Sequence, residues 1–168
     1  SIQPEVFLNS TENHLYEKVV LSIFKKLHKN KNIIAKKKSS LYCNACKKYL
    51  FEAHVKGECP YCKYDNASSN ECEKCALIHE DKELIKPICM DCGNIAILKP
   101  LKRIYFDLEP YRGVLQEHYK KINLSSRLKE FIDIAFSKRL PEIPISHIAN
   151  AGIKVPLEEF QGQVIFSL

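Results

Sequence analysis

The sequence predicts an α+β protein in which helices flank a small, β-rich domain built around cysteine pairs. Three observations predict it. All eight cysteines fall within fifty consecutive residues, apolar residues before and after them recur at helical spacing, and short β-branched or aromatic runs lie between the pairs. A chain of 168 residues buries roughly 70% of its unfolded surface, so it can form a hydrophobic core without disulfides.

The first expected element is a helix over residues 12–30. Asn9, Ser10 or Thr11 can cap its start, because their side-chain oxygens accept hydrogen bonds from free N–H groups. Lysines in its last turns suit the negative end of the helix dipole. Its apolar side chains form one stripe that predicts packing on a core. The stripe consists of Leu15, Val19, Val20, Ile23, Phe24 and Leu27.

Short strands are expected on either side of the cysteine pairs. Residues 33–34 form one candidate and residues 50–56 another, while residues 95–98 and 104–108 predict a strand pair around Pro100. The middle of the chain is therefore expected to be β-rich.

Helical spacing returns after Pro110 and predicts two helices. The first has one face formed by Tyr111, Val114, Leu115, His118 and Ile122, and the second has an apolar stripe formed by Leu128, Phe131, Ile132, Ala135 and Phe136. Ser125 or Ser126 can cap the second helix, and the Leu140-Pro141 step ends it. A last short strand is expected at residues 163–166. These elements divide the chain into residues 1–40 (strand, helix and basic strand), 41–100 (cysteine-rich domain) and 101–168 (strand, two helices and return strand).

The cysteines form four Cys-x-x-Cys pairs, at positions 43 and 46, 59 and 62, 72 and 75, and 89 and 92. Two residues between thiols let both sulfurs of a tight turn bind one tetrahedral metal ion, and two such turns complete a four-cysteine site. Eight thiolates therefore predict two metal ions. This pattern fits a reducing cytosol better than a secreted disulfide framework, and no apolar run is long enough to span a membrane. We therefore expect a cytoplasmic protein.

Charge is informative through its distribution and not through its total. The formal net charge of +6 falls to +2 once eight thiols are deprotonated and two divalent ions are bound. Residues 18–51, however, contain ten lysines and no acidic residue. This lysine block suits contact with phosphates, and a solvated lysine face is the alternative. The lysines nearest the first cysteine pairs are Lys36, Lys37, Lys38, Lys47 and Lys48.

The residues around the pairs carry a resemblance to a known family. The runs over residues 41–51, 55–62, 70–75 and 84–93 resemble the connective-peptide zinc domain of methionyl-tRNA synthetases in its two-knuckle form. Four pairs in the same order with similar flanks make this a specific signal. The resemblance covers nearly the whole chain. It implies two structural zinc ions inserted in the Rossmann-like core of a class I synthetase, and a role in translation.

The resemblance also implies which pairs share an ion. Relatives with one knuckle keep the two inner pairs, so one site would comprise Cys59, Cys62, Cys72 and Cys75, and the other would comprise Cys43, Cys46, Cys89 and Cys92. Sequential pairing along the chain is the alternative. Iron is the competing metal, although zinc is the commoner ion in all-thiolate structural sites. His54 and His79 are expected to be ordinary surface or packing residues, because eight cysteines already suffice.

Catalysis is expected to lie outside this sequence. Members of the family activate methionine with ATP through HIGH and KMSKS signatures, and neither is present here. The chain also departs from the family pattern: His147 and Ile148 stand where Arg and Asp are usual, Ala151 and Leu168 stand where Trp is usual, and the run at residues 66–72 lacks the usual Arg-Gly-Asp. Residues that face the active site in the family have therefore changed, while the cysteines are kept.

Three functional hypotheses follow. The first is a stand-alone, catalytically inactive paralogue that binds tRNA, ribosomal RNA or the ribosome; Ser1 agrees with it, because an initiator Met is often removed before Ser. The second is an excised connective-peptide piece of an active methionine–tRNA ligase. A catalytic synthetase chain is a further candidate partner. The third is a metal-stabilised protein-interaction module, which a weak salt dependence of binding would distinguish from phosphate contact.

Overall fold

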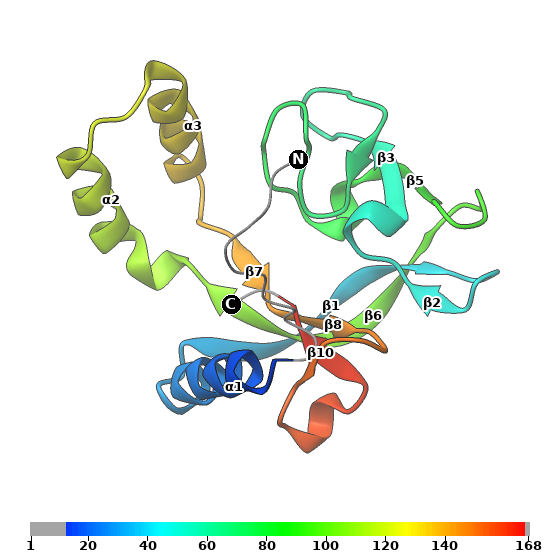
Figure 1. The fold of residues 1–168 in the computed structure, drawn as a ribbon. Coiled ribbons are helices and arrows are strands. Elements are labelled where there is room, and N and C mark those ends of the chain that lie inside the picture. Colours follow the sequence, from blue (N-terminus) through cyan, green and yellow to red (C-terminus); the bar gives the residue numbers. More distant parts are fainter. Residues whose placement is uncertain (1–12, 167–168) are drawn as a thin grey trace, which may run out of the picture. The chain divides into compact units, whose positions relative to one another are not determined.

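The computed structural model describes residues 13–166, and within them the chain forms two compact units. Unit 1 comprises residues up to Lys36, then Arg103–Phe106 and Ile143 onward. Unit 2 comprises Lys37–Lys102 and Asp107–Glu142. Figure 1 shows the elements of both units.

Unit 1 contains the first helix and a small sheet. Helix α1 spans His14–Lys29 and confirms the helix expected at residues 12–30, while the proposed caps Asn9, Ser10 and Thr11 lie outside the described residues. Asn13 caps it instead, since its Oδ1 accepts hydrogen bonds from the N–H groups of Leu15 (2.9 Å) and Tyr16 (3.0 Å). Much of the expected stripe is exposed. Only Phe24 is buried, in a core with Ile33, Ile104, Ile145, Val155 and Phe160.

The small sheet of unit 1 has the strand order β8-β10-β9, with all pairs antiparallel. Strand β8 spans Ser146–Ile148, β9 Ile153–Lys154 and β10 Gln163–Ile165, and the 3-10 turn η4 (Glu158–Phe160) precedes β10. Strand β10 confirms the last expected strand. The fully buried Ser146 Oγ holds this region together, because it donates to Gln163 Oε1 (2.7 Å) and accepts from the N–H of Ile104 (3.0 Å).

A second sheet has the order β2-β1-β6-β7. Its long strands are β1 (Ile33–Cys43) and β6 (Ile97–Asp107), and its short ones are β2 (Lys48–Tyr49) and β7 (Glu142–Pro144). The expectation of a two-residue strand at 33–34 was too short. The expectation of two strands around Pro100 was wrong, because one strand runs through the proline. Pro100 has no N–H to donate, and its carbonyl accepts a hydrogen bond from Tyr49 Oη (2.9 Å).

The third sheet, with the order β4-β3-β5, forms the base of the cysteine-rich region in unit 2. Its strands are β4 (Ala67–Ser68), β3 (Val55–Glu58) and β5 (Ile85–Cys89). The strand expected at residues 50–56 is replaced by the 3-10 turn η1 (Glu52–His54) followed by β3. Another 3-10 turn, η2 (Asp81–Glu83), leads into β5. The end of β3 adjoins Cys59 and the end of β5 is Cys89, so this sheet positions two cysteines.

Helices α2 (Arg112–Lys121) and α3 (Ser126–Phe136) form a hairpin in unit 2, after the 3-10 turn η3 (Glu109–Tyr111). Both expected helices are confirmed, and Ser125 caps α3 by accepting from the N–H of Leu128 (3.3 Å). Neither helix has a fully buried residue, and Val114 is 70% exposed. Their apolar faces are thus only partly covered.

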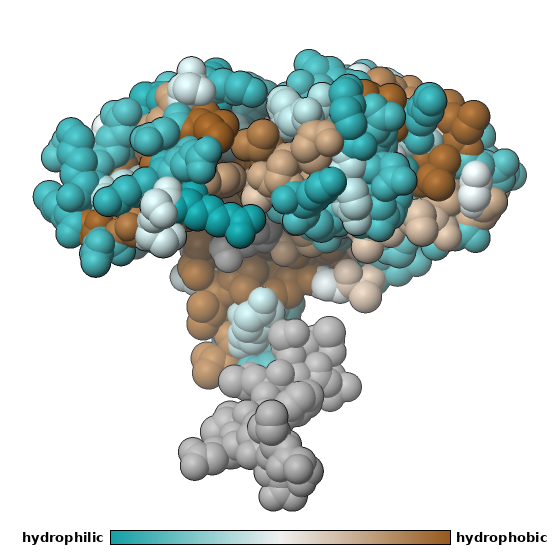
Figure 2. All heavy atoms as spheres, turned by 90° about the horizontal axis from the view of Figure 1, so that it is seen from above, coloured by the Kyte–Doolittle hydropathy of each residue, from teal (hydrophilic) through white to brown (hydrophobic). Residues whose placement is uncertain are grey.

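Hydrophobic side chains also reach the surface elsewhere. Figure 2 shows hydrophobic side chains among hydrophilic ones on the face drawn there. Over the described residues as a whole, the exposed hydrophobic side chains include Ile88, Met90 and Ile95. Within residues 13–166, no helix combines the length and the apolar character required to cross a membrane.

Candidate metal centres

Each cysteine pair sits on a turn that reverses the backbone through a left-handed residue. The residue after the second cysteine has positive φ in all four turns: Lys47 (53°), Lys63 (61°), Ala76 (57°) and Gly93 (72°). In three of them its N–H donates to the carbonyl of the first cysteine, as from Gly93 to Cys89 (2.8 Å). Only glycine adopts this conformation without strain. Such a turn aims both sulfurs to the same side, and three of the four turns do so at a conformational cost.

The structure gathers the eight cysteines into two groups of four. In each group the sulfur atoms all lie within 4.8 Å of one another. The inner group combines Cys59 and Cys62 with Cys72 and Cys75, and the outer group combines Cys43 and Cys46 with Cys89 and Cys92. The structure therefore has the nested grouping that the family resemblance implied, and not the sequential one.

Contacts between the turns are close in both groups. In the inner group, Cys62 Sγ lies 3.6 Å from Cys72 Sγ and Cys59 Sγ lies 3.9 Å from Cys75 Sγ. In the outer group, the corresponding distances are 3.5 Å between Cys43 and Cys92 and 3.9 Å between Cys46 and Cys89. The first cysteine of every pair is buried in the core of unit 2, whereas the second is partly or fully exposed. That core also contains Leu41, Leu50, Val55, Ala67, Leu84 and Ala96.

The thiols of the inner group differ in acidity. Burial raises the pKa of Cys59, but the N–H groups of Cys62 and Tyr61 point at its sulfur and bring that pKa down to about 7. Burial raises the pKa of Cys75 to about 12, with further contributions from the neighbouring thiols of Cys62 and Cys72. Cys59 is thus the more acidic thiol of the two, and a cation bound in the group would favour the thiolate form of Cys75.

The outer group has the same asymmetry for a different reason. The amide of Asn94 donates to Cys92 Sγ (3.3 Å) and lowers the pKa of Cys92 to about 6. The pKa of Cys46 is raised to about 12, chiefly by its hydrogen bond with Cys92. Asn94 also anchors the turn, because its carbonyl accepts from the N–H of Cys89 (2.8 Å). Sequence reasoning missed Asn94, since it lies outside the Cys-x-x-Cys pattern.

These groups suit a tetrahedral metal ion. Four sulfur donors converge in each, and N–H groups donate to Cys43 and Cys59 in the manner that stabilises metal-bound thiolates. The two groups could each hold one ion. Among the described residues, neither histidine considered in the sequence joins them: His79 is 3% exposed, and His54 is a surface residue whose Nδ1 lies 3.7 Å from Asp91.

The five lysines proposed for RNA contact have different surroundings. Lys38 is held in ion pairs with Glu80 (2.9 Å) and Glu142 (3.0 Å), and Lys48 pairs with Asp91. Lys37 and Lys47 are exposed. Strand alternation along β1 puts Lys37 on the face opposite Lys36 and Lys38. The structure therefore does not bring the five amino groups together on one face.

The Lys38 contacts were not foreseen from the sequence. Burial lowers the pKa of Lys38, but its bonds to Glu80 and Glu142 outweigh burial and raise that pKa overall. Glu142 is nearly buried and also faces Arg139 (3.4 Å). The partners lie 42 residues or more from Lys38, so local sequence patterns carry no signal of this network.

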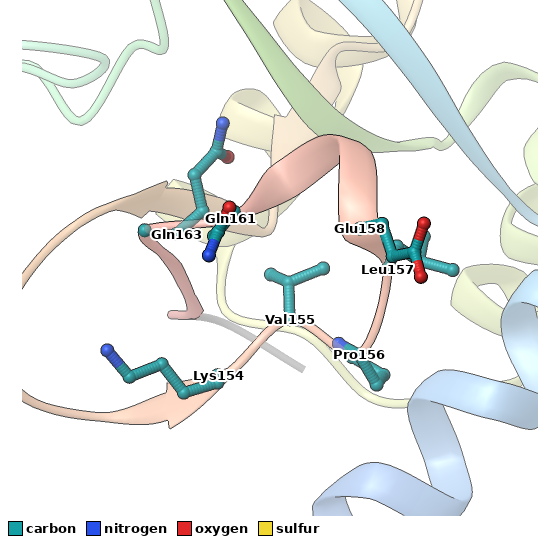
Figure 3. Close-up of a pocket in the computed structure, with 8 residues that line it drawn as sticks. Lys154, Val155, Pro156, Leu157, Glu158, Gln161 and Gln163 are labelled. Carbon is teal, nitrogen blue, oxygen red and sulfur yellow. The ribbon is translucent and has the colours of Figure 1, made fainter.

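A shallow hollow of about 580 Å³ lies in unit 1, along the loop between β9 and β10 (Figure 3). Lys154, Glu158, Gln161 and Gln163 contribute polar side chains to its lining, and Val155, Pro156 and Leu157 contribute apolar ones. It contains no cysteine or histidine.

The fold and the two cysteine groups define an α+β protein with two four-cysteine sites that could bind metal, and comparison with known proteins places it in a family. A family model described as "tRNA synthetases class I (M)" matches residues 1–167. The chain therefore belongs to the class I tRNA synthetase family of this type.

Individual relatives agree with this assignment. Methionine–tRNA ligase from Borrelia duttonii is 30% identical over 160 residues, which cover 93% of this chain and 22% of that protein. The corresponding enzyme from Methanobrevibacter smithii is 29% identical and covers 99% of this chain. The structure of Mycobacterium tuberculosis methionyl-tRNA synthetase with methionyl-adenylate has the same fold over 96% of this chain, with a TM-score of 0.55 and 16% identity. The chain spans about a quarter of the length of these relatives.

Proposed function

We propose that this chain is a zinc-stabilised, RNA-contacting domain of the methionyl-tRNA synthetase type that does not aminoacylate tRNA by itself. The observation that carries the proposal is the nested pair of four-cysteine groups, in a chain whose family acts on tRNA. We further propose that it corresponds to the insertion in a class I Rossmann core, divided at about residues 40 and 100.

Zinc is the proposed ion in both groups. Eight thiolates and no oxygen ligand favour a borderline-soft cation, and zinc adopts the tetrahedral geometry that two facing turns provide. Iron in a rubredoxin-like site is the alternative, and a visible charge-transfer absorption would reveal it. The binding energy of the ions would stabilise the fold, because the cysteine turns are short and include strained residues.

RNA contact is proposed chiefly through two exposed lysines, Lys37 on strand β1 and Lys47 on the first cysteine turn, with Lys36, Lys38 and Lys48 as further candidates. Lys38 and Lys48 are engaged in ion pairs, so substituting them would disturb the fold as well as binding. The sharper test is the Lys37→Gln/Lys47→Gln variant. Its affinity for a methionine tRNA transcript should fall severalfold, and its slope of log K against log salt should fall by about 1.5.

The matched control for this test is Lys154→Gln/Lys63→Gln, which removes the same charge at exposed positions elsewhere. Wild-type binding that hardly depends on salt would instead support the protein-interaction module. Equal binding by wild type and the Lys37/Lys47 variant would refute the proposed lysines.

Of the two readings of this chain, we favour a stand-alone paralogue and not a piece of an active ligase. The support is the departure of His147, Ile148 and Ala151 from the family pattern; His147 packs its ring 4.6 Å from that of Phe166. We propose a cytoplasmic location and tRNA, ribosomal RNA or a catalytic synthetase chain as partners. The intact mass of the native polypeptide decides the point: a species near 19 kDa supports the paralogue, and one several times heavier refutes it.

A further inference from the structure

The loop between α2 and α3 carries a concentration of positive charge that the lysine block does not include. Residues 118–129 contain no acidic residue and four basic ones. Lys120 and Lys121 end α2, and Arg127 and Lys129 begin α3, so all four lie where the two helices are joined (Figure 1). We call these four residues the hairpin tip.

Most of this charge is not neutralised within the protein. All four side chains are exposed. Lys120 pairs with Glu117 (2.8 Å), whereas in the part of the chain that the structure describes no carboxylate pairs with Lys121, Arg127 or Lys129. The hairpin tip therefore differs from Lys38 and Lys48, whose charges are already balanced by glutamates or an aspartate.

The base of the hairpin holds the tip in a defined position. Arg112 Nη1 donates to the carbonyl of Phe136 (2.8 Å) and its Nη2 to that of Lys138, which joins the start of α2 to the end of α3. The same guanidinium also donates to both carboxylate oxygens of Glu109, from Nε (2.8 Å) and from Nη2 (3.0 Å). Arg139 adds an ion pair to Asp107 (2.7 Å). These contacts brace the backbone of the hairpin, so binding has to order only the exposed lysine and arginine side chains of the tip.

We propose that the hairpin tip is an RNA-backbone contact surface, with Lys121, Arg127 and Lys129 as the residues that contact phosphates. Exposed arginine and lysine side chains at the joined ends of two helices suit phosphates spaced along a backbone, and membership of a tRNA synthetase family makes RNA the fitting polyanion. Ile122 and Leu128 are partly exposed beside them, so an anionic membrane is the competing partner for the test. This inference rests on the RNA-binding role proposed above and adds a second RNA-contact surface to the lysines named there.

The test compares two triple variants of the metal-loaded 168-residue chain. Lys121→Gln/Arg127→Gln/Lys129→Gln removes the charge of the tip, and Lys86→Gln/Lys102→Gln/Lys154→Gln removes the same charge from exposed positions outside both the tip and the lysine block. At about 0.1 M KCl we expect the tip variant to bind a methionine tRNA transcript roughly tenfold to a hundredfold more weakly, with a log–log salt slope smaller by about 2 to 3. The control should change less than about threefold.

The possible results separate the tip surface from the proposed RNA-binding function. Wild-type binding with an unchanged tip variant overturns this inference and leaves the proposed function standing. Equal weakening by both variants also overturns it, because the effect would be one of net charge. No RNA binding by wild type overturns the proposed function and this surface together. Tip-dependent binding to phosphatidylcholine–phosphatidylserine vesicles without tip-dependent RNA binding would assign the surface to a membrane and refute the inference.

Discussion

Gly57 in strand β3 is the position where one added carbon should do the most damage to the metal-binding region. A Cβ at this position would lie 2.7 Å from the carbonyl oxygen of Ile85 and 2.9 Å from Leu84 Cγ. The first atom is backbone of the neighbouring strand β5, so no rotamer change can relieve the clash. The strands must separate, and they lead to Cys59 of the inner group and Cys89 of the outer one.

We expect Gly57→Ala to destabilise the protein by about 3 kcal/mol, the upper part of the usual range for overpacking. For a chain of this size that corresponds to a fall in Tm of roughly 6–12 °C. Both ions should also leave faster in the presence of a chelator. Gly113→Ala is the matched control, because its Cβ would meet nothing within 4 Å in helix α2, and we expect a gain of about 0.5 kcal/mol.

The assay is thermal and urea denaturation of the zinc-loaded variants, followed by far-ultraviolet circular dichroism, with metal release timed by a colorimetric chelator. A Gly57→Ala protein that melts within about 2 °C of wild type would refute the reasoning. It would mean that β3 and β5 are not packed as closely as the Ile85 contact requires.

Gly93→Ala should lower the unfolding free energy by about 1 kcal/mol through backbone strain alone, since φ is 72° and the added Cβ meets nothing within 4 Å. Ala76→Gly should raise it by a similar amount, because Ala76 has a φ of 57°. Equal urea midpoints for the two variants would contradict this. Ser146→Ala should cost about 1–3 kcal/mol because it leaves the N–H of Ile104 and the amide of Gln163 without their buried partner, and a neutral effect in urea denaturation would count against that network. Arg112 is the main cause that lowers the pKa of Glu109 to about 2 from its ordinary value near 4.5. The ionised carboxylate therefore stabilises the hairpin base fully above pH 4.5 and loses this effect as pH falls toward 2. The difference in unfolding free energy between wild type and Glu109→Gln should shrink over that pH range, and a constant difference would exclude the mechanism.

The cysteine spacing and helical periodicity predicted much of this molecule because both are local signals. Helices α1, α2 and α3 and strand β10 were found near their expected positions, and the resemblance of the flanking residues implied the nested grouping. Periodicity predicted which faces were apolar but not what covers them, so the exposure of Val114 and Ile23 was not foreseen.

What the sequence could not predict depends on contacts between distant residues. Pro100 was read as a break, although its carbonyl is used by Tyr49 and the strand continues through it. The lysine block looked uniform in sequence, yet Lys38 is balanced by glutamates far along the chain. The left-handed backbone at Lys47, Lys63 and Ala76 could not be predicted either, because glycine is the residue type that indicates this conformation and only the fourth turn has one, at Gly93.

The central claim is that the chain binds two metal ions in two nested four-cysteine sites, and native mass spectrometry of two double variants tests it most directly. Cys59→Ser/Cys72→Ser removes two ligands from the inner group alone, so we expect one ion per chain to remain. Cys43→Ser/Cys59→Ser damages both groups, so we expect no stable ion. The reverse result, with no ion in the first variant and one in the second, would show sequential pairing and contradict the account.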